Sequence, residues 1–233
     1  MKVAIITPIP EIFKSFLENT MIRKSIIKNT IDISTIDLRN FGVGSYKQID
    51  DTPYGGGDGM VMMAEPLGKA INHAIDIVGG YNDLQIVFPT PQGSSWDQEA
   101  VLEVSRVKRL IIVCGHYKGI DERIIEKYIT KEISVGNYVL SNGEIPAMLI
   151  LDSITRILPG TLNSIQSALT DTYSYGLYDH PHYTKPRIFE DMIVPEVLLS
   201  GHHKKIKEWR QNKREIRTKE KNPKLWMEFL KLE

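Results

Sequence analysis

The stretch Arg109-Leu-Ile-Ile-Val-Cys-Gly-His-Tyr-Lys-Gly-Ile-Asp121 decides the fold class of this chain. Its first six residues are almost entirely apolar, which predicts a strand buried on both faces. The glycine-containing segment after it predicts a loop, and residues 120–128 predict a short helix. A buried strand that leads through a loop into a helix is the repeating unit of a helix-covered parallel sheet.

The same alternation extends over residues 1–160. Apolar runs predict strands, and apolar residues at helical spacing predict helices. A long loop is expected at residues 39–60. The predicted strands are 2–7, 30–38, 84–88 and 132–135, and the predicted helices are 10–17, 64–78, 97–107 and 145–158. The pattern indicates an α/β domain with a mostly parallel sheet.

The remainder of the chain has a different pattern. Residues 161–172 are small and polar, which is typical of a linker. Three helices are then predicted at 195–200, 202–221 and 223–232, and they indicate a small helical domain spanning 173–233. The last helix is expected to bury one apolar face, made of Leu225, Trp226, Phe229 and Leu230.

Charge is distributed unevenly along the 233 residues, although the net charge is zero. Residues 201–233 contain 11 Lys and Arg against 5 Glu, a net charge of +6 that leaves −6 on residues 1–200. This asymmetry indicates a polyanionic partner, and a solvated amphipathic helix is the alternative. The single cysteine, Cys114, lies in an apolar run, so we expect it to be buried. One cysteine and no targeting or membrane segment predict a cytoplasmic protein.

Four segments rich in glycine or proline are the candidate binding elements. The cluster Pro53-Tyr-Gly-Gly-Gly-Asp-Gly-Met60 is neither a dinucleotide-binding fingerprint nor a phosphate-binding loop, so NAD and nucleotide triphosphates lack support. The other three, residues 88–93, 115–121 and 134–146, each follow a predicted strand. Ligands of open α/β sheets bind at such strand ends, and exposed main chain there suits an adenine-like edge.

Five motifs together resemble one family, the bacterial tRNA (guanine-N1)-methyltransferases called TrmD. They are Pro-Tyr-Gly-Gly-Gly-x-Gly-Met (53–60), Cys-Gly-x-Tyr-x-Gly-Ile-Asp-Glu-Arg (114–123), Ser-Val-Gly-x-Tyr-Val-Leu-Ser-x-Gly-Glu-Ile-Pro-Ala (134–147), Pro-His-Tyr-Thr-Lys-Pro (181–186) and Leu-Ser-Gly-His-His (199–203). The resemblance runs in order from residue 1 to about residue 230.

The resemblance implies a SPOUT-type α/β-knot, in which a mostly parallel sheet contains a deep trefoil knot, followed by the small helical domain. It implies a homodimer that transfers a methyl group from S-adenosylmethionine to N1 of the guanosine 3′ of the anticodon, position 37. Each active site would be shared between subunits. The implied cofactor-binding residues are Phe88, Pro89, Thr90, Pro91, Gly115, Tyr117, Lys118, Ser134, Val135, Gly136, Asn137, Tyr138, Val139, Leu140, Asn142, Gly143 and Pro146.

The family's catalytic positions fall on Asp171, as the general base for N1, and on Arg156, which would stabilise charge on guanine O6. The expected tRNA contacts are Tyr54, Gly55, Gly56, Gly57, His182, Lys204, Lys207, Arg210 and Arg214. Magnesium is a further cofactor that the resemblance allows. The family usually has Arg-Tyr-Glu where this chain has His116-Tyr117-Lys118, and an Asp at Asn137.

Two other functions are weighed against this one. A metal-dependent phosphoesterase would use Asp171, His180 and His182, but histidines at i and i+2 across a proline lack a common helical face. We therefore expect no metal ligands and assign these histidines structural or RNA-contacting roles. A non-catalytic RNA-binding module would explain the basic helix but not the three loops.

Overall fold

The computed structural model describes residues 1–161, 171–173 and 176–231. The chain divides into two compact units, Met1–Asn163 and Ser164–Glu233, and each is described by itself. Most of the predicted linker, residues 161–172, lies outside the described residues. No helix in the described ranges has the length and apolar character needed to cross a membrane.

The first unit is built on a five-stranded sheet in the order β2-β1-β6-β5-β7, and every neighbouring pair is parallel. The predicted parallel sheet is therefore confirmed. Its central strands are buried because their residues are apolar on both faces. The strands are β1 (Lys2–Thr7), β2 (Asp32–Asp37), β5 (Leu84–Ser95), β6 (Arg109–Val113) and β7 (Lys131–Ser134).

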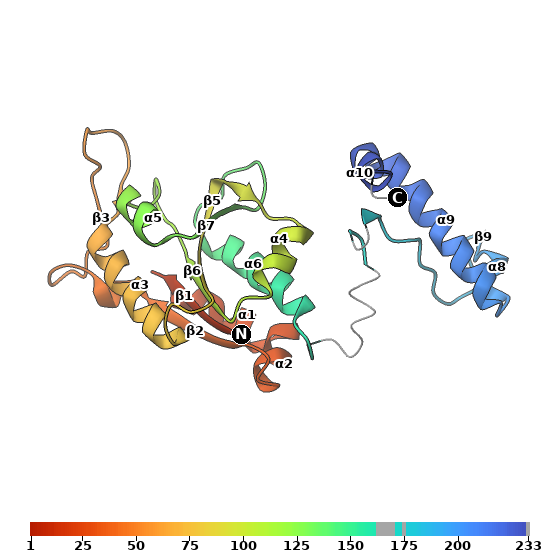
Figure 1. Cartoon of the computed structure of the whole chain (residues 1–233), viewed down its shortest axis with the longest axis horizontal. Helices are drawn as coiled ribbons and strands as arrows, with labels where there is room; N and C mark the ends of the chain where they lie inside the picture. The colour runs from red at the N-terminus through yellow and green to blue at the C-terminus, as the bar shows by residue number, and fades with distance from the viewer. Residues whose placement is uncertain (162–170, 174–175, 232–233) are drawn as a thin grey trace. The chain divides into compact units, whose positions relative to one another are not determined.

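Helices cover both faces of this sheet (Figure 1). Ala4 and Ile6 of β1 face a core formed with α3 (Ala64–Val78) and α5 (Glu122–Tyr128). Val3 and Ile5 face the opposite core, formed with α4 (Gln98–Val104) and α6 (Glu144–Ile157). Alternate strand residues point to opposite faces, so one strand contributes to both cores.

Several short elements complete the first unit, and sequence reasoning missed some of them. A helix, α2 (Thr20–Ile27), and a two-stranded pair, β3 (Asp50–Asp51) with β4 (Val61–Met62), were not predicted. Strand β5 also continues past its predicted end at residue 88. Its pairing with β7 runs to Pro89, breaks over residues 90–93, which include Pro91, and resumes at Ser94, so that Pro89 and Ser94 both stand opposite Ile133. The remaining elements are η1 (Pro10–Phe13), α1 (Lys14–Glu18) and η2 (Leu38–Phe41).

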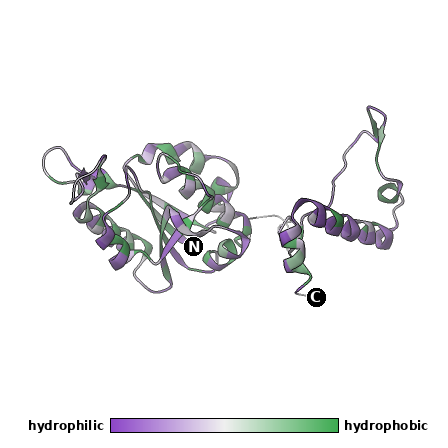
Figure 2. Ribbon diagram, turned by 90° about the horizontal axis from the view of Figure 1, so that it is seen from above, coloured by the Kyte–Doolittle hydropathy of each residue, from purple (hydrophilic) through white to green (hydrophobic). Residues whose placement is uncertain are grey.

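The second unit contains the long helix α9 (His203–Lys221), which Figure 2 shows as largely hydrophilic. Two short helices, α8 (Glu196–Leu199) and α10 (Pro223–Phe229), flank it and confirm the three predicted helices. A hairpin of β8 (Ile188–Phe189) and β9 (Met192–Ile193) was not predicted. Its four residues are apolar and exposed, and strands of two residues are too short to show a period.

The prediction of a buried apolar face on α10 is wrong. Trp226 and Phe229 stack at 5.6 Å between ring centroids, but both are half-buried, and Leu230 lies beyond the helix and is 45% exposed. Within this unit α10 packs against α9, and two helices alone cannot enclose a core.

Candidate functional site

Three loops at the carboxyl end of the sheet surround one cavity of about 330 Å³. Two of them follow β6 and β7, and the third, residues 88–93, is the irregular second half of β5. The three strands are neighbours in the sheet order β6-β5-β7. Because parallel strands end at the same edge, the segments after them meet there. The crevice predicted from residues 88–93, 115–121 and 134–146 is therefore present.

Sixteen of the 17 predicted cofactor-binding residues line this cavity. The exception is Asn137, which belongs to the 134–146 loop but does not line the cavity. The lining also contains five residues that sequence reasoning missed: Gln92, His116, Gly119, Ile133 and Ser141. Four of these belong to the same loops, so loop membership would have found them. Ile133 is a buried residue of β7, and nothing in the sequence predicts that it lines the cavity.

Glycine allows two of these loops to touch. A Cβ atom on Gly143 would lie 2.7 Å from the backbone N of Gly115 and 2.8 Å from Cα of Cys114. The Gly143 N–H donates to the Gly115 carbonyl at 2.8 Å. A side chain at position 143 would have to separate the two loops, so this contact fixes the cavity wall.

Tyr117 is held in an unusual backbone conformation at the cavity. Its φ is 58°, in the left-handed region that non-glycine residues rarely adopt. Its side chain is half exposed, and burial together with the Asp50 carboxylate raises the pKa of its hydroxyl, an effect that Arg39 partly offsets. Such backbone strain is concentrated at ligand sites, where the fold holds a residue against its preference.

A buried carboxylate lies under the cavity wall. Glu144, the first residue of α6, is completely buried. Its Oε1 accepts a hydrogen bond from the Thr7 hydroxyl at 2.6 Å and lies 2.7 Å from Nε2 of His116. Its Oε2 has no hydrogen-bond partner among the described residues. A buried polar group needs a hydrogen-bond partner, so the contact with His116 stabilises Glu144 and ties the 115–121 loop to α6.

Cys114, at the end of β6, is inert in this setting. It is 1% exposed, as predicted. Burial raises the pKa of its thiol well above the usual range, and the Glu144 carboxylate adds to the effect. Since the thiolate is the reactive form, this cysteine cannot act as a nucleophile near neutral pH.

The glycine cluster 53–60 is an exposed loop beside the cavity. Gly55, Gly56 and Gly57 all have positive φ, and Tyr54 is fully exposed. The end of the cluster is fixed to a cavity loop, because Lys118 N–H donates to the Met60 carbonyl at 3.0 Å. The cluster therefore presents exposed main chain and one aromatic ring next to the site.

Comparison with known proteins agrees with this arrangement. The family described as tRNA (Guanine-1)-methyltransferase TrmD matches residues 1–228. A protein named tRNA (guanine-N(1)-)-methyltransferase from Desulforamulus reducens is 43% identical over 225 residues, covering 97% of this chain and 88% of that protein. A protein of the same name from Clostridioides difficile is 42% identical over 221 residues, covering 95% of each chain.

The chain belongs to the TrmD family.

The two positions expected to be catalytic in the TrmD family lie in separate units. Arg156 is on the exposed face of α6, in line with Ile145, Leu149 and Asp152 at helical spacing. Asp171 is half-buried and belongs to the second unit.

The second unit carries the positive charge that the sequence predicts for a tRNA-binding part. Lys204, Lys207, Arg210 and Arg214, here called the cationic stripe, lie on α9. At 3.6 residues per turn they fall within about a third of the helix circumference. The first three are exposed and Arg214 is half-buried, with its Nε donating to the Tyr178 carbonyl at 3.3 Å.

Proposed function

We propose that this TrmD-family protein transfers a methyl group from S-adenosylmethionine to N1 of the guanosine at position 37 of tRNA. The observation that carries the proposal is the cavity built by three glycine- and proline-containing loops at the carboxyl end of a parallel sheet. Open α/β sheets bind ligands at this edge. The names of the relatives indicate that N1 of a guanine in tRNA is the methyl acceptor.

The cavity fits the cofactor by size and by lining. Its volume of about 330 Å³ lies within the range of small-molecule sites. Phe88 offers an apolar wall, and the glycines leave main-chain groups accessible to an adenine edge. S-adenosylmethionine supplies an electrophilic methyl group bound to a sulfonium. The residues that would hold it are the 16 predicted residues that line the cavity.

The acceptor chemistry needs a base and a cation. Guanine N1 carries a proton at neutral pH, and its lone pair becomes available as that proton leaves. In our proposal the Asp171 carboxylate accepts the proton, and the Arg156 guanidinium stabilises the negative charge that develops on O6. His182, Tyr54, the glycines 55–57 and the cationic stripe would bind the tRNA, chiefly through its phosphates.

The proposed enzyme is a homodimer with shared active sites. On α6, Ile145 is 56% and Leu149 is 42% exposed, and both lie on the same face as Arg156. Exposed apolar residues in a row on one helix favour a self-complementary contact about a twofold axis. One subunit would then supply the cofactor loops and the other would supply Asp171.

A trefoil knot would explain the path between β7 and α6. Strand β7 lies beside β5 on the side away from β6, yet the chain after β7 returns to Gly115 at the end of β6. It must therefore cross the end of β5, which is the kind of crossing that a knot requires.

We place the methyl transfer in the cytoplasm, where the single cysteine stays reduced.

Magnesium does not fit the cavity. None of the described residues that line it is Asp or Glu, whereas magnesium prefers carboxylate and other oxygen ligands. Lys118 occupies the position where the family usually has Glu, and its side chain packs over Gly59. No step of the proposed reaction uses this ion.

Calorimetry with S-adenosylmethionine tests the cofactor part of the proposal. We expect one molecule per chain with a dissociation constant in the micromolar range. Absence of binding by the folded protein would leave a non-catalytic RNA-binding module as the better description.

A complementation experiment tests the shared site. Asp171→Asn and Gly143→Val subunits, each checked for folding and for loss of activity on its own, are combined by co-expression with different tags. If half of the dimers are mixed, about a quarter of wild-type activity should return, because each mixed dimer has one intact site. No recovery in purified mixed dimers would place the base and the cofactor on the same subunit.

A further inference from the structure

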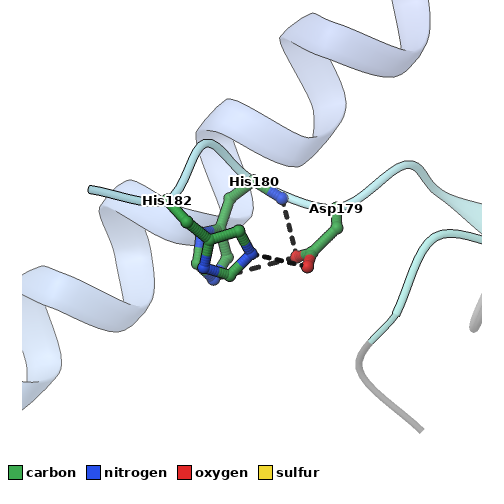
Figure 3. A group of neighbouring side chains, drawn as sticks. All are labelled: Asp179, His180 and His182. Carbon is green, nitrogen blue, oxygen red and sulfur yellow. Dashed lines mark hydrogen bonds and ion pairs between the residues drawn. The ribbon is translucent and has the colours of Figure 1, made fainter. Parts of the chain in front are cut away.

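Three metal-ligating side chains converge in the second unit, before the hairpin (Figure 3). They are Asp179, His180 and His182, and one ligand atom from each lies within 4.8 Å of the other two. Nε2 of His182 is 2.8 Å from Oδ2 of Asp179, and Nε2 of His180 is 3.8 Å from Oδ1. The two imidazole rings are 4.3 Å apart between centroids. The i, i+2 spacing of the histidines did not predict this convergence.

The hydrogen bonds around the cluster orient its ligand atoms. Nδ1 of His180 lies 3.1 Å from the Pro181 carbonyl, so Nδ1 carries the proton and donates. Nε2 of the neutral ring then keeps its lone pair and points toward the Asp179 carboxylate. A histidine that donates its other ring N–H to a carbonyl is the usual arrangement around a metal ligand.

The backbone of the cluster is fixed to α9. The Arg217 guanidinium donates to the Asp179 carbonyl at 3.2 Å, and the Tyr178 N–H donates to the buried Thr218 hydroxyl oxygen at 2.8 Å. The His180 N–H donates to Oδ1 of Asp179 at 2.7 Å. The backbone that carries the three side chains is therefore already ordered, which reduces the conformational entropy lost when they bind an ion.

We propose that Asp179, His180 and His182 bind one transition-metal ion of the zinc type, with water in the fourth position. Two imidazoles and one carboxylate form a ligand set that suits zinc and its neighbours, whereas magnesium and calcium prefer oxygen alone. The ion is structural: it holds residues 179–182 against α9 and takes no part in methyl transfer. Asp171, which the phosphoesterase hypothesis required, is not among the ligands.

Two features limit the affinity. In a tetrahedral zinc site with bonds of about 2.0–2.1 Å the ligand atoms lie about 3.3 Å apart. The ligand atoms of His182 and Asp179 are closer than this, at 2.8 Å, and those of His180 and Asp179 are farther apart, at 3.8 Å, so the three side chains must readjust to take up an ion. The Arg210 guanidinium near His180 also opposes a cation. We therefore expect a dissociation constant in the micromolar range rather than the much tighter binding of zinc-finger sites.

The test uses the full-length protein without a histidine tag, freed of metal with a chelator and then dialysed. Zinc binding is measured by calorimetry, and cobalt is added separately to record visible absorption, which is strong for tetrahedral sites. We expect one ion per chain. His182→Ala and Asp179→Asn should each weaken binding at least tenfold, and cobalt absorption should fall accordingly.

His203→Ala is the matched control, because His203 is exposed, lies in the same unit and is not part of the cluster. Its zinc affinity should equal that of the wild type. Circular dichroism confirms that each variant is folded.

Unchanged binding in a folded His182→Ala variant, or loss of binding in His203→Ala alone, would overturn the proposal, as would no binding at all. Removal of the ion should leave S-adenosylmethionine binding unchanged. The failure of this metal site is therefore distinguishable from the failure of the proposed methyl transfer.

Discussion

Replacing Gly143 with alanine adds one methyl group at the closest contact between two cavity loops. The new Cβ would lie 2.7 Å from N of Gly115 and 2.8 Å from Cα of Cys114, both backbone atoms that cannot rotate away. An ordinary contact requires the loops to separate by about 0.7 Å or more. That movement also strains the Gly143 N–H to Gly115 carbonyl hydrogen bond of 2.8 Å.

The loss of stability has two sources, the close contact and the strained hydrogen bond. Overpacking contributes about 1–3 kcal/mol, and a weakened hydrogen bond contributes about 1 kcal/mol. We expect the free energy of unfolding to fall by about 2–4 kcal/mol in urea denaturation followed by circular dichroism. Because the cavity wall moves, S-adenosylmethionine affinity should fall at least tenfold in calorimetry.

Gly68→Ala is the matched control. It makes the same chemical change inside α3, where the nearest atom to a new Cβ, Cδ1 of Ile124, is at an ordinary 3.7 Å. Alanine favours a helix interior, so this variant should be more stable than wild type by about 0.5–1 kcal/mol. A Gly143→Ala variant that stays within about 0.5 kcal/mol of wild type and binds the cofactor normally would show that the two loops do not need this close contact.

Three further predictions concern catalysis, tRNA binding and the buried carboxylate. Asp171→Asn should bind S-adenosylmethionine with an affinity within twofold of wild type. Its rate of methyl transfer, measured with labelled cofactor, should fall about a hundred- to ten-thousandfold. A loss of only a few fold would show that Asp171 is not the base. Replacing the four residues of the cationic stripe with glutamine should lower tRNA affinity and reduce the slope of log affinity against log salt by about 3, and an unchanged slope would contradict this role. His116→Ala should cost about 1–3 kcal/mol in urea denaturation because the buried Glu144 side chain then keeps only the Thr7 hydroxyl as a partner. Glu103→Ala, which removes the exposed ion pair with Lys131, should cost less than about 1 kcal/mol.

The sequence could predict most of the first unit because its apolar patterns are long. The run 109–114 is almost continuously apolar and the helix 64–78 has a clear helical period, and the structure reproduces both within a residue. The three loops were predictable for the same reason, since locating the strands also locates their carboxyl ends.

Features that depend on tertiary contacts could not be predicted. Glu144 reads as an ordinary surface acid, but the first turn of α6 lies under the end of β1, where Thr7 and His116 enclose it. The Asp179 cluster depends on the anchoring of residues 178 and 179 to α9, which no local spacing encodes. The α10 prediction failed for the opposite reason: its apolar stripe is genuine, but the unit offers too little surface to cover it.

Product analysis tests the central claim most directly. The protein is incubated with S-adenosylmethionine and two tRNA transcripts that differ only in G or A at position 37, and the nuclease digests are analysed by mass spectrometry. We predict a single N1-methylguanosine, located at position 37 of the first transcript, and no methylation of the second. Methylation at another base or another guanine atom, or equal labelling of both transcripts, would contradict the proposed function.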